Sequence, residues 1–255
     1  MLTRVTALAA GIAAAALATP VMAQEEGEDK RWKATAELGA IATSGNTEST
    51  SFQGKVDATH ELRRWKNQYV FSTLFQEDEI TQPDGSTETE TTAEKFSASV
   101  KSAYKLAREN TNLFVFGSHT DDEFGAYSTY STIAVGYGAR LYDAETMQLD
   151  VELGPGYFWA EQEFEDGTSE SEDGAIIRGA AQYEWQLSDN AEFKQVLSVE
   201  SGQDNTRTVS DTSLSARINS SMQMKVGFNL STDTEVAPGK EKTDTTTYAN
   251  IVYKF

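Results

Sequence analysis

The chain has 255 residues, no cysteine, and 40 acidic against 21 basic side chains, which gives a formal net charge of −19. The absence of cysteine excludes disulfide frameworks and thiolate metal sites, and the acidic balance argues against nucleic acid as a partner. The length fits one barrel domain or one to two globular domains.

The first 23 residues are organised like a secretory signal peptide. Arg4 is a minimal charged region, an apolar run follows from Val5 to Ala18, and Pro20 ends that run. The run is shorter than the ~20 apolar residues that a bilayer-spanning helix needs. We therefore expect export, with cleavage after Ala23, followed by a flexible acidic lead at 24–31.

Apolar and polar residues alternate in repeated segments from residue 32 to residue 255. In one segment Phe96, Ala98 and Val100 alternate with Lys95 and Lys101. Successive strand side chains point to opposite faces, so such a segment has one apolar and one polar face. The predicted segments are 32–43, 49–62, 67–78, 91–106, 112–120, 129–142, 147–161, 174–187, 191–202, 207–219, 222–233 and 244–255. The pattern predicts an all-β fold, a transmembrane antiparallel up-and-down β-barrel of about 12 strands.

The connections between these segments alternate between short and long. The short ones lie near 63–65, 108–110, 143–145, 188–190 and 219–221. The longer, mostly acidic ones lie at 44–47, 81–90, 121–128, 163–173, 202–206 and 235–243. Outer-membrane barrels sort their loops in this way. A soluble periplasmic β-sandwich that binds a ligand is the alternative fold, and it gives no reason for such sorting.

Aromatic residues cluster near the segment ends, as in the girdles that barrels carry at both membrane interfaces. They are Trp32, Trp65, Tyr69, Tyr104, Tyr127, Tyr130, Tyr142, Tyr157, Trp159, Tyr183, Trp185 and Tyr253. In the last segment Ile251, Tyr253 and Phe255 share one face. This resembles the terminal strand that barrel-assembly machinery reads. We expect it to pair with 32–43, because lipid does not tolerate unpaired backbone groups.

Ala-Glu-Leu-Gly at 36–39 is followed by Thr-Ser-Gly-Asn-Thr-Glu-Ser at 43–49. This pattern resembles the N-terminal hallmark of the salt-induced outer-membrane protein family, also catalogued as domain-of-unknown-function family 481. The Gly45-Asn46 step suits a tight hairpin turn. The resemblance covers about residues 32–255. It implies an outer-membrane location, with expression linked to salt in some members, and it carries over no activity, ligand or catalytic residue.

Catalytic candidates are few, because the chain has two histidines, His60 and His119. Some barrel enzymes that act on lipid use a serine and a histidine on the outer wall. Ser118 precedes His119, but alternation places the two on opposite faces, so they form no dyad. We expect a protein that is not an enzyme and has no cofactor or metal. A lipid-directed barrel enzyme based on either histidine is the alternative.

Charged residues in mid-strand positions are the candidates for the lumen. We predict that the lumen-lining residues include Lys95, Lys101, Arg140, Arg178, Glu184, Arg217 and Lys225. Inward glycines such as Gly39, Gly154 and Gly227 are expected to leave room there. The function remains open between an envelope-structural role with a plugged lumen and a narrow channel. A link to salt or osmotic stress comes from the family resemblance alone.

The expected location is the outer membrane, which sets the expected partners. These are outer-membrane lipid, lipopolysaccharide and the barrel-assembly machinery. Weak binding of divalent cations is a further expectation for the acidic loops at 121–123 and 163–173, because calcium and magnesium prefer several oxygen ligands. The spacing of these acids does not match an EF-hand.

Overall fold

The computed structural model describes residues 31–255 except 44–48, 82–86, 165–166 and 237, all within one compact unit. The expected signal peptide, residues 24–30 of the lead, the Gly45-Asn46 turn and the loop residues Glu165 and Asp166 lie outside the described residues. No helix in the described part of the chain is long and apolar enough to cross a membrane.

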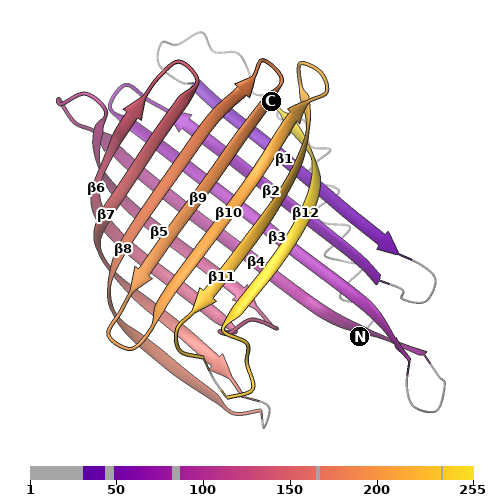
Figure 1. The fold of residues 1–255 in the computed structure, drawn as a ribbon. Coiled ribbons are helices and arrows are strands. Elements are labelled where there is room, and N and C mark those ends of the chain that lie inside the picture. Colours follow the sequence, from indigo (N-terminus) through magenta and orange to yellow (C-terminus); the bar gives the residue numbers. More distant parts are fainter. Residues whose placement is uncertain (1–30, 44–48, 82–86, 165–166, 237) are drawn as a thin grey trace. The chain divides into compact units, whose positions relative to one another are not determined.

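Twelve antiparallel strands form one closed barrel, in which each strand pairs with its neighbours in sequence and β1 pairs with β12 (Figure 1). The strands are β1 (Arg31–Thr43), β2 (Ser49–Glu61), β3 (Trp65–Thr81), β4 (Thr87–Lys105), β5 (Thr111–Asp122), β6 (Thr129–Asp143), β7 (Met147–Glu163), β8 (Ser169–Ser188), β9 (Ala191–Ser201), β10 (Thr206–Arg217), β11 (Met222–Asp233) and β12 (Thr243–Lys254). The predicted fold and strand number are confirmed, and a single closed sheet excludes the two-sheet sandwich.

The largest differences from the predicted boundaries occur at β4 and β8, which begin at Thr87 and Ser169 rather than at 91 and 174. Both starts belong to long hairpins. The β3–β4 ladder continues to the pair Thr81 and Thr87, and the β7–β8 ladder continues to Glu163 and Ser169. Backbone hydrogen bonds do not require apolar side chains, so the ladder extends beyond the residues whose hydrophobicity alternates.

The outer surface of the barrel is apolar over its middle. Val100, Val135, Leu153 and Ile177 are about half exposed, with Leu153 at 62 %. Their sequence neighbours point inward, and Arg178 beside Ile177 is buried. A continuous apolar exterior around a polar interior is the arrangement of a barrel that spans lipid.

Aromatic rings gather at both ends of this exterior. Where the short turns lie, Trp32 stacks on His60 with 4.2 Å between ring centroids, and Trp65 packs edge-on against Tyr104. Near the long loops, Tyr157 packs against Trp159. These positions suit interfacial anchoring.

Two of the expected girdle residues are exceptions. Tyr127 and Tyr130 are buried, so the prediction that places them in the girdle is wrong. Tyr130 has the same inward parity as buried Thr132, and Tyr127 lies in the loop between β5 and β6.

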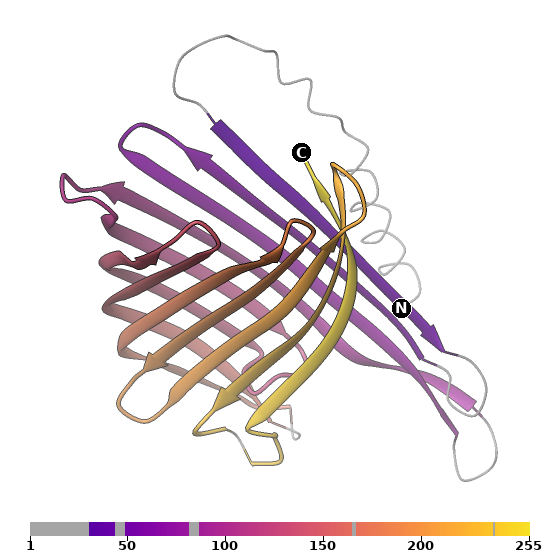
Figure 2. The same ribbon diagram turned by 45° about the horizontal axis from the view of Figure 1, so that its top comes forward.

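The closure between β1 and β12 is the shortest seam of the barrel. In the described residues it comprises four residue pairs, from Thr35 with Lys254 to Leu38 with Ile251. By comparison, β1 and β2 share thirteen. Beyond the last pair, Leu38 with Ile251, the two strands diverge (Figure 2). The expected pairing of the terminal strand is thus present, but it is confined to the end of the barrel that holds the chain terminus.

Candidate functional site

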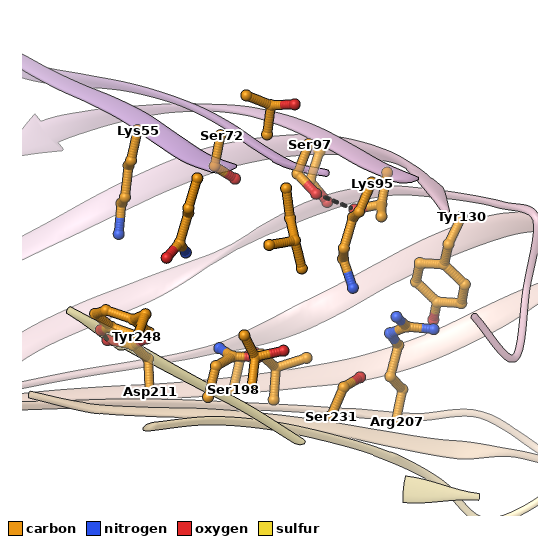
Figure 3. A pocket seen from close by; sticks show the side chains of 18 of the residues that line it. Lys55, Ser72, Lys95, Ser97, Tyr130, Ser198, Arg207, Asp211, Ser231 and Tyr248 are labelled. Atoms are coloured by element: carbon orange, nitrogen blue, oxygen red, sulfur yellow. Dashed lines mark hydrogen bonds between the residues drawn. The ribbon is translucent and has the colours of Figure 1, made fainter. Parts of the chain in front are cut away.

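A cavity of about 310 Å³ lies inside the barrel and is bordered by polar and charged side chains. One side comes from β2–β4, where Lys55, Ser72, Lys95 and Ser97 project inward (Figure 3). Residues of β9–β12 face them, including Arg207, Asp211 and Tyr248. Alternation along each strand produces this interior, because the residues on either side of a lipid-facing residue point into the lumen.

A charge cluster crosses the interior and is centred on Arg178. Its guanidinium lies 3.3 Å from Glu200 and 3.9 Å from Glu152, and it covers the ring of Phe116 at 3.9 Å. Glu152 also accepts a 2.6 Å hydrogen bond from Lys101. Arg178 Nε and Nη1 lack aligned hydrogen-bond acceptors in the described structure, so their attraction to the carboxylates is mainly Coulombic. Such a buried network depends on every partner, since removing one leaves an uncompensated charge.

A second buried ion pair lies inside the barrel, next to the seam between β1 and β12. Lys225 on β11 donates to both carboxylate oxygens of Glu37 on β1 at 3.1 Å, and Asn250 on β12 donates to the same carboxylate at 3.3 Å. All three residues are buried. The pair therefore links β11, β12 and β1 across the position where backbone pairing is shortest.

The predicted lumen residues do not form one cluster. Lys95, Arg178 and Lys225 border the cavity, and Lys95 pairs with Asp122 at 2.8 Å. Lys101 belongs to the Arg178 cluster. The others form local pairs nearer the short turns or lie at the rim: Arg140 pairs with Asp150 and Asp143, Glu184 pairs with Lys194, and Arg217 is exposed at the end of β10.

Sequence reasoning missed many of the polar residues that border the cavity, among them the charged residues Lys55, Glu200, Arg207 and Asp211 and the phenol of Tyr248. Tyr248 donates hydrogen bonds to both oxygens of Asp211 at 3.0 and 2.9 Å. The available signal was the same alternation, because Lys55 precedes outward Val56 and Asp211 precedes outward Thr212. The two-residue alternation identifies these side chains as inward-facing, but it does not show which strands face one another across the lumen.

Inward glycines do not widen the lumen as expected. A Cβ added to Gly227 would overlap the ring of Tyr248, and one added to Gly39 would overlap the Asn250 amide. At Gly154 it would overlap the backbone of β6. The glycines thus accommodate neighbouring side chains or allow close approach of two strands.

Asn205, buried in the loop between β9 and β10, holds three loops together. Its amide nitrogen donates to Tyr127 at 3.1 Å and to Asp233 at 2.9 Å. Its carbonyl oxygen accepts from the backbone nitrogens of Thr234 at 2.9 Å and Glu235 at 3.2 Å. This "Asn205 clamp" joins the β5–β6, β9–β10 and β11–β12 loops at the long-loop end of the barrel.

An apolar cluster lies beside the clamp. Tyr127, Tyr130, Phe158 and Ile176 form it together with Ala126 and Ala160, and Val236 packs against it. Tyr127 donates to Glu172 at 3.1 Å. Burial, with the Glu172 carboxylate as the next contribution, raises the pKa of Tyr127 to about 12. The clamp and the cluster therefore hold the loops together at this mouth of the barrel.

The histidines lie on the outer wall. His60 stacks on Trp32, and its buried Nε2 has no hydrogen-bond partner in the described residues. Exposed His119 contacts Ser131 of β6 rather than Ser118, with 2.8 Å between Nδ1 and Oγ. A shallow pocket of about 260 Å³ on this wall includes Ser131, Trp159 and Asp173.

The acidic loops hold no recognisable cation site in the part of the chain that the structure describes, where no three His, Asp or Glu residues are grouped to bind a metal ion. Asp122 is engaged by Lys95, and Glu172 accepts from Tyr127.

Comparisons with solved structures give similarities of fold alone. The translocator domain of the autotransporter NalP from Neisseria meningitidis is 13% identical, with 98% of this chain and 96% of that chain covered and a TM-score of 0.47. The NanC porin is 10% identical over 88% of this chain and 98% of its own, with a TM-score of 0.49. An outer membrane channel from Pseudomonas putida F1 is 11% identical over 89% and 96%, with a TM-score of 0.47.

Sequence comparison identifies relatives directly. The chain is 28% identical to "Uncharacterized protein YdiY" of Escherichia coli (strain K12) over 234 residues, which cover 91% of this chain and 87% of that protein. Residues 36–255 match the family described as "Protein of unknown function, DUF481". The match covers almost the whole barrel, and the chain, an outer-membrane-type β-barrel, therefore belongs to the DUF481 family.

Proposed function

We propose that this protein is a narrow channel of the outer membrane for small solutes, to which it is exported by its first 23 residues. The observation that carries the proposal is the cavity of about 310 Å³ bordered by charged and hydroxyl side chains from facing walls. Barrels of eight strands are filled by side chains and those of sixteen or more leave wide channels. Twelve strands with a partly filled lumen fit a narrow pathway.

The ion pairs inside the barrel limit the space that is left for a solute. Lys101 and Arg178 reach Glu152, and Lys225 reaches Glu37, so each pair occupies part of the cross-section. The Asn205 clamp ties three loops together at one mouth of the barrel. We therefore expect small conductance steps and a pathway for ions and solutes of a few non-hydrogen atoms.

Single-channel recording tests this proposal. The purified protein is refolded, its insertion is verified by heat modifiability on a gel, and current is recorded in a planar bilayer across salt concentrations. Discrete steps would support the channel. A protein that is inserted but silent would contradict it, and the crossing ion pairs would then favour the envelope-structural alternative.

The family resemblance adds a physiological proposal, a role in salt or osmotic stress. Growth of a deletion strain at low and high salt, with and without complementation, tests that role. Lipid, lipopolysaccharide and the barrel-assembly machinery are the proposed partners, and divalent cations at the acidic loops remain a weaker one.

We propose that the protein is not an enzyme, although one contact favours an alternative. Ser131 Oγ lies 2.8 Å from His119 Nδ1 beside a surface pocket on the lipid-facing wall. A hydroxyl beside an imidazole is a nucleophile and base arrangement, but it usually needs a third group to orient the base. Lipid hydrolysis that disappears in Ser131→Ala and His119→Ala, but not in His60→Ala, would establish the enzyme.

A further inference from the structure

Among the residues that the structure describes, one cationic side chain that borders the cavity has no carboxylate partner. Five cationic side chains border it: Lys55, Lys95, Arg178, Arg207 and Lys225. The last four pair with Asp122, Glu200, Asp233 and Glu37, respectively, at 2.8–3.3 Å. Lys55 forms no ion pair or hydrogen bond with any described residue.

The position of Lys55 explains why its ammonium group lacks a direct carboxylate contact. Its register partner on β1 is Glu37, which could neutralise it. The carboxylate of Glu37 is already engaged by Lys225 and Asn250, at 3.1 and 3.3 Å. On its other side Lys55 is opposite Ser72, which is neutral. A half-buried ammonium group therefore faces the cavity with its hydrogen-bond donors available.

We propose that Lys55 forms a binding site for a small, singly charged anion of the carboxylate class within the lumen. Hydroxyl and amide groups of the cavity lining, including that of Ser72, which lies opposite Lys55 on β3, and that of Gln53, can bind further oxygen atoms of such a solute. An ammonium donor to a carboxylate makes a charge-assisted hydrogen bond, which is stronger than a neutral one.

The facing wall limits the charge of the solute. Asp211 borders the same cavity, and its carboxylate receives two hydrogen bonds from Tyr248. A second negative charge on the solute would meet this carboxylate and that of Glu37 without a spare cation. The cavity volume of about 310 Å³ corresponds to roughly ten water-sized volumes, which leaves room for an anion such as acetate or lactate together with several water molecules.

This inference rests on the proposed channel, and bilayer recording examines it first. Reversal potentials are measured in a potassium chloride gradient, and sodium acetate is then added to compete for the site. The wild type should be anion-selective, with chloride current reduced by acetate. Lys55→Gln should lose the selectivity and require about tenfold or more acetate for the same reduction. Lys55→Arg should retain both properties.

Arg108→Gln is the matched control, because it removes one positive charge from an exposed turn outside the cavity. It should leave the reversal potential unchanged. A conducting protein that prefers cations, or whose selectivity is the same in Lys55→Gln, would overturn the anion site while leaving the channel. Selectivity lost in Lys55→Gln with no acetate effect in the wild type would overturn the carboxylate class and assign the site to inorganic anions.

A silent protein would overturn the channel instead, and binding then decides the inference. Acetate labelled with carbon-13 is titrated with refolded protein in detergent, and its line width is followed by nuclear magnetic resonance. Broadening that disappears in Lys55→Gln, with heat modifiability preserved, would support the site. Absence of broadening, or equal broadening in both proteins, would reject it.

Discussion

Lys101 on β4 and Glu152 on β7 meet inside the barrel, with 2.6 Å between Nζ and Oε1, although β5 and β6 separate their strands in the sheet. The contact therefore crosses the lumen. Glu152 is also 3.9 Å from Arg178, so one carboxylate balances two cations. This geometry makes the interior electrostatically coupled rather than a set of independent local pairs.

Replacing Lys101 with Met should lower the stability of the barrel by about 1–3 kcal/mol. The change leaves Glu152 with its weaker partner, and a buried charge that loses one partner is costly. The expected loss is at the lower end for buried pairs because the Lys101 side chain is 28% exposed. The temperature midpoint of heat modifiability measures it. Lys101→Met combined with Glu152→Gln should recover part of the loss, and strictly additive effects would contradict direct coupling.

Asn205→Ala should loosen the three loops that the Asn205 clamp joins at the long-loop end of the barrel. The substitution removes hydrogen bonds to Tyr127, Asp233, Thr234 and Glu235 at once. Limited proteolysis should then cut within 234–242 faster than in the wild type, and channel open time should rise. Asn219→Ala is the control, because its side chain accepts from Ser221 and Met222 in a short turn elsewhere. Equal cleavage in both variants would contradict the clamp.

The sequence predicts the barrel much better than it predicts the lumen. Alternation depends on nearest neighbours along the chain, so inward residues such as Arg178 and Lys225 are identified directly. Contacts such as that of Lys101 with Glu152 depend on strand tilt and on how the barrel closes. The two-residue alternation gives no information on either. The burial of Tyr127 is missed for a similar reason: its loop folds back onto Phe158 and Ile176, and local composition does not encode that contact.

Tyr127 should remain protonated well above the pH at which an exposed tyrosine ionises. Its pKa is raised to about 12 by burial, whereas an unfolded tyrosine has a pKa of about 10. The raised pKa of Tyr127 therefore stabilises the folded state. This contribution to the free energy of unfolding is fully present below pH ~10 and is lost as the pH rises toward about 12. The difference in tyrosinate absorbance between wild type and Tyr127→Phe should titrate near pH 12. A difference that titrates near pH ~10 would show that the loop does not bury the ring.

Gly154→Ala should disturb the contact between β6 and β7. The new Cβ would overlap the carbonyl oxygen of Val135 and the Cα of Gly136, both backbone atoms that cannot rotate away. The adjacent Pro155 already lacks a backbone N–H donor, so few backbone hydrogen bonds join the two strands at this position. We expect the free energy of unfolding to fall by about 1–3 kcal/mol, which lowers the temperature midpoint of heat modifiability. Gly117→Ala, whose nearest atom would lie 3.9 Å away, is the control and should change the midpoint much less.

The C-terminal ring and the C-terminal backbone should have separable roles. Phe255 is 71% exposed and packs against Tyr253, so its ring contributes little to the interior. Its backbone nitrogen donates to Ala34 at 3.0 Å and extends the short β1–β12 seam by one bond. Phe255→Ala keeps that bond and removes the ring, whereas deletion of Phe255 removes both.

If cellular assembly machinery reads the ring, Phe255→Ala should reduce the amount of barrel in the outer membrane severalfold but leave refolding in detergent unchanged. Deletion should impair both, because the seam has so few pairs that one terminal bond matters. Phe255→Tyr should behave like the wild type in both assays. Normal assembly of Phe255→Ala in cells would contradict the assembly role, and normal refolding of the deletion would show that the remaining pairs and the Lys225–Glu37 ion pair are sufficient to close the barrel.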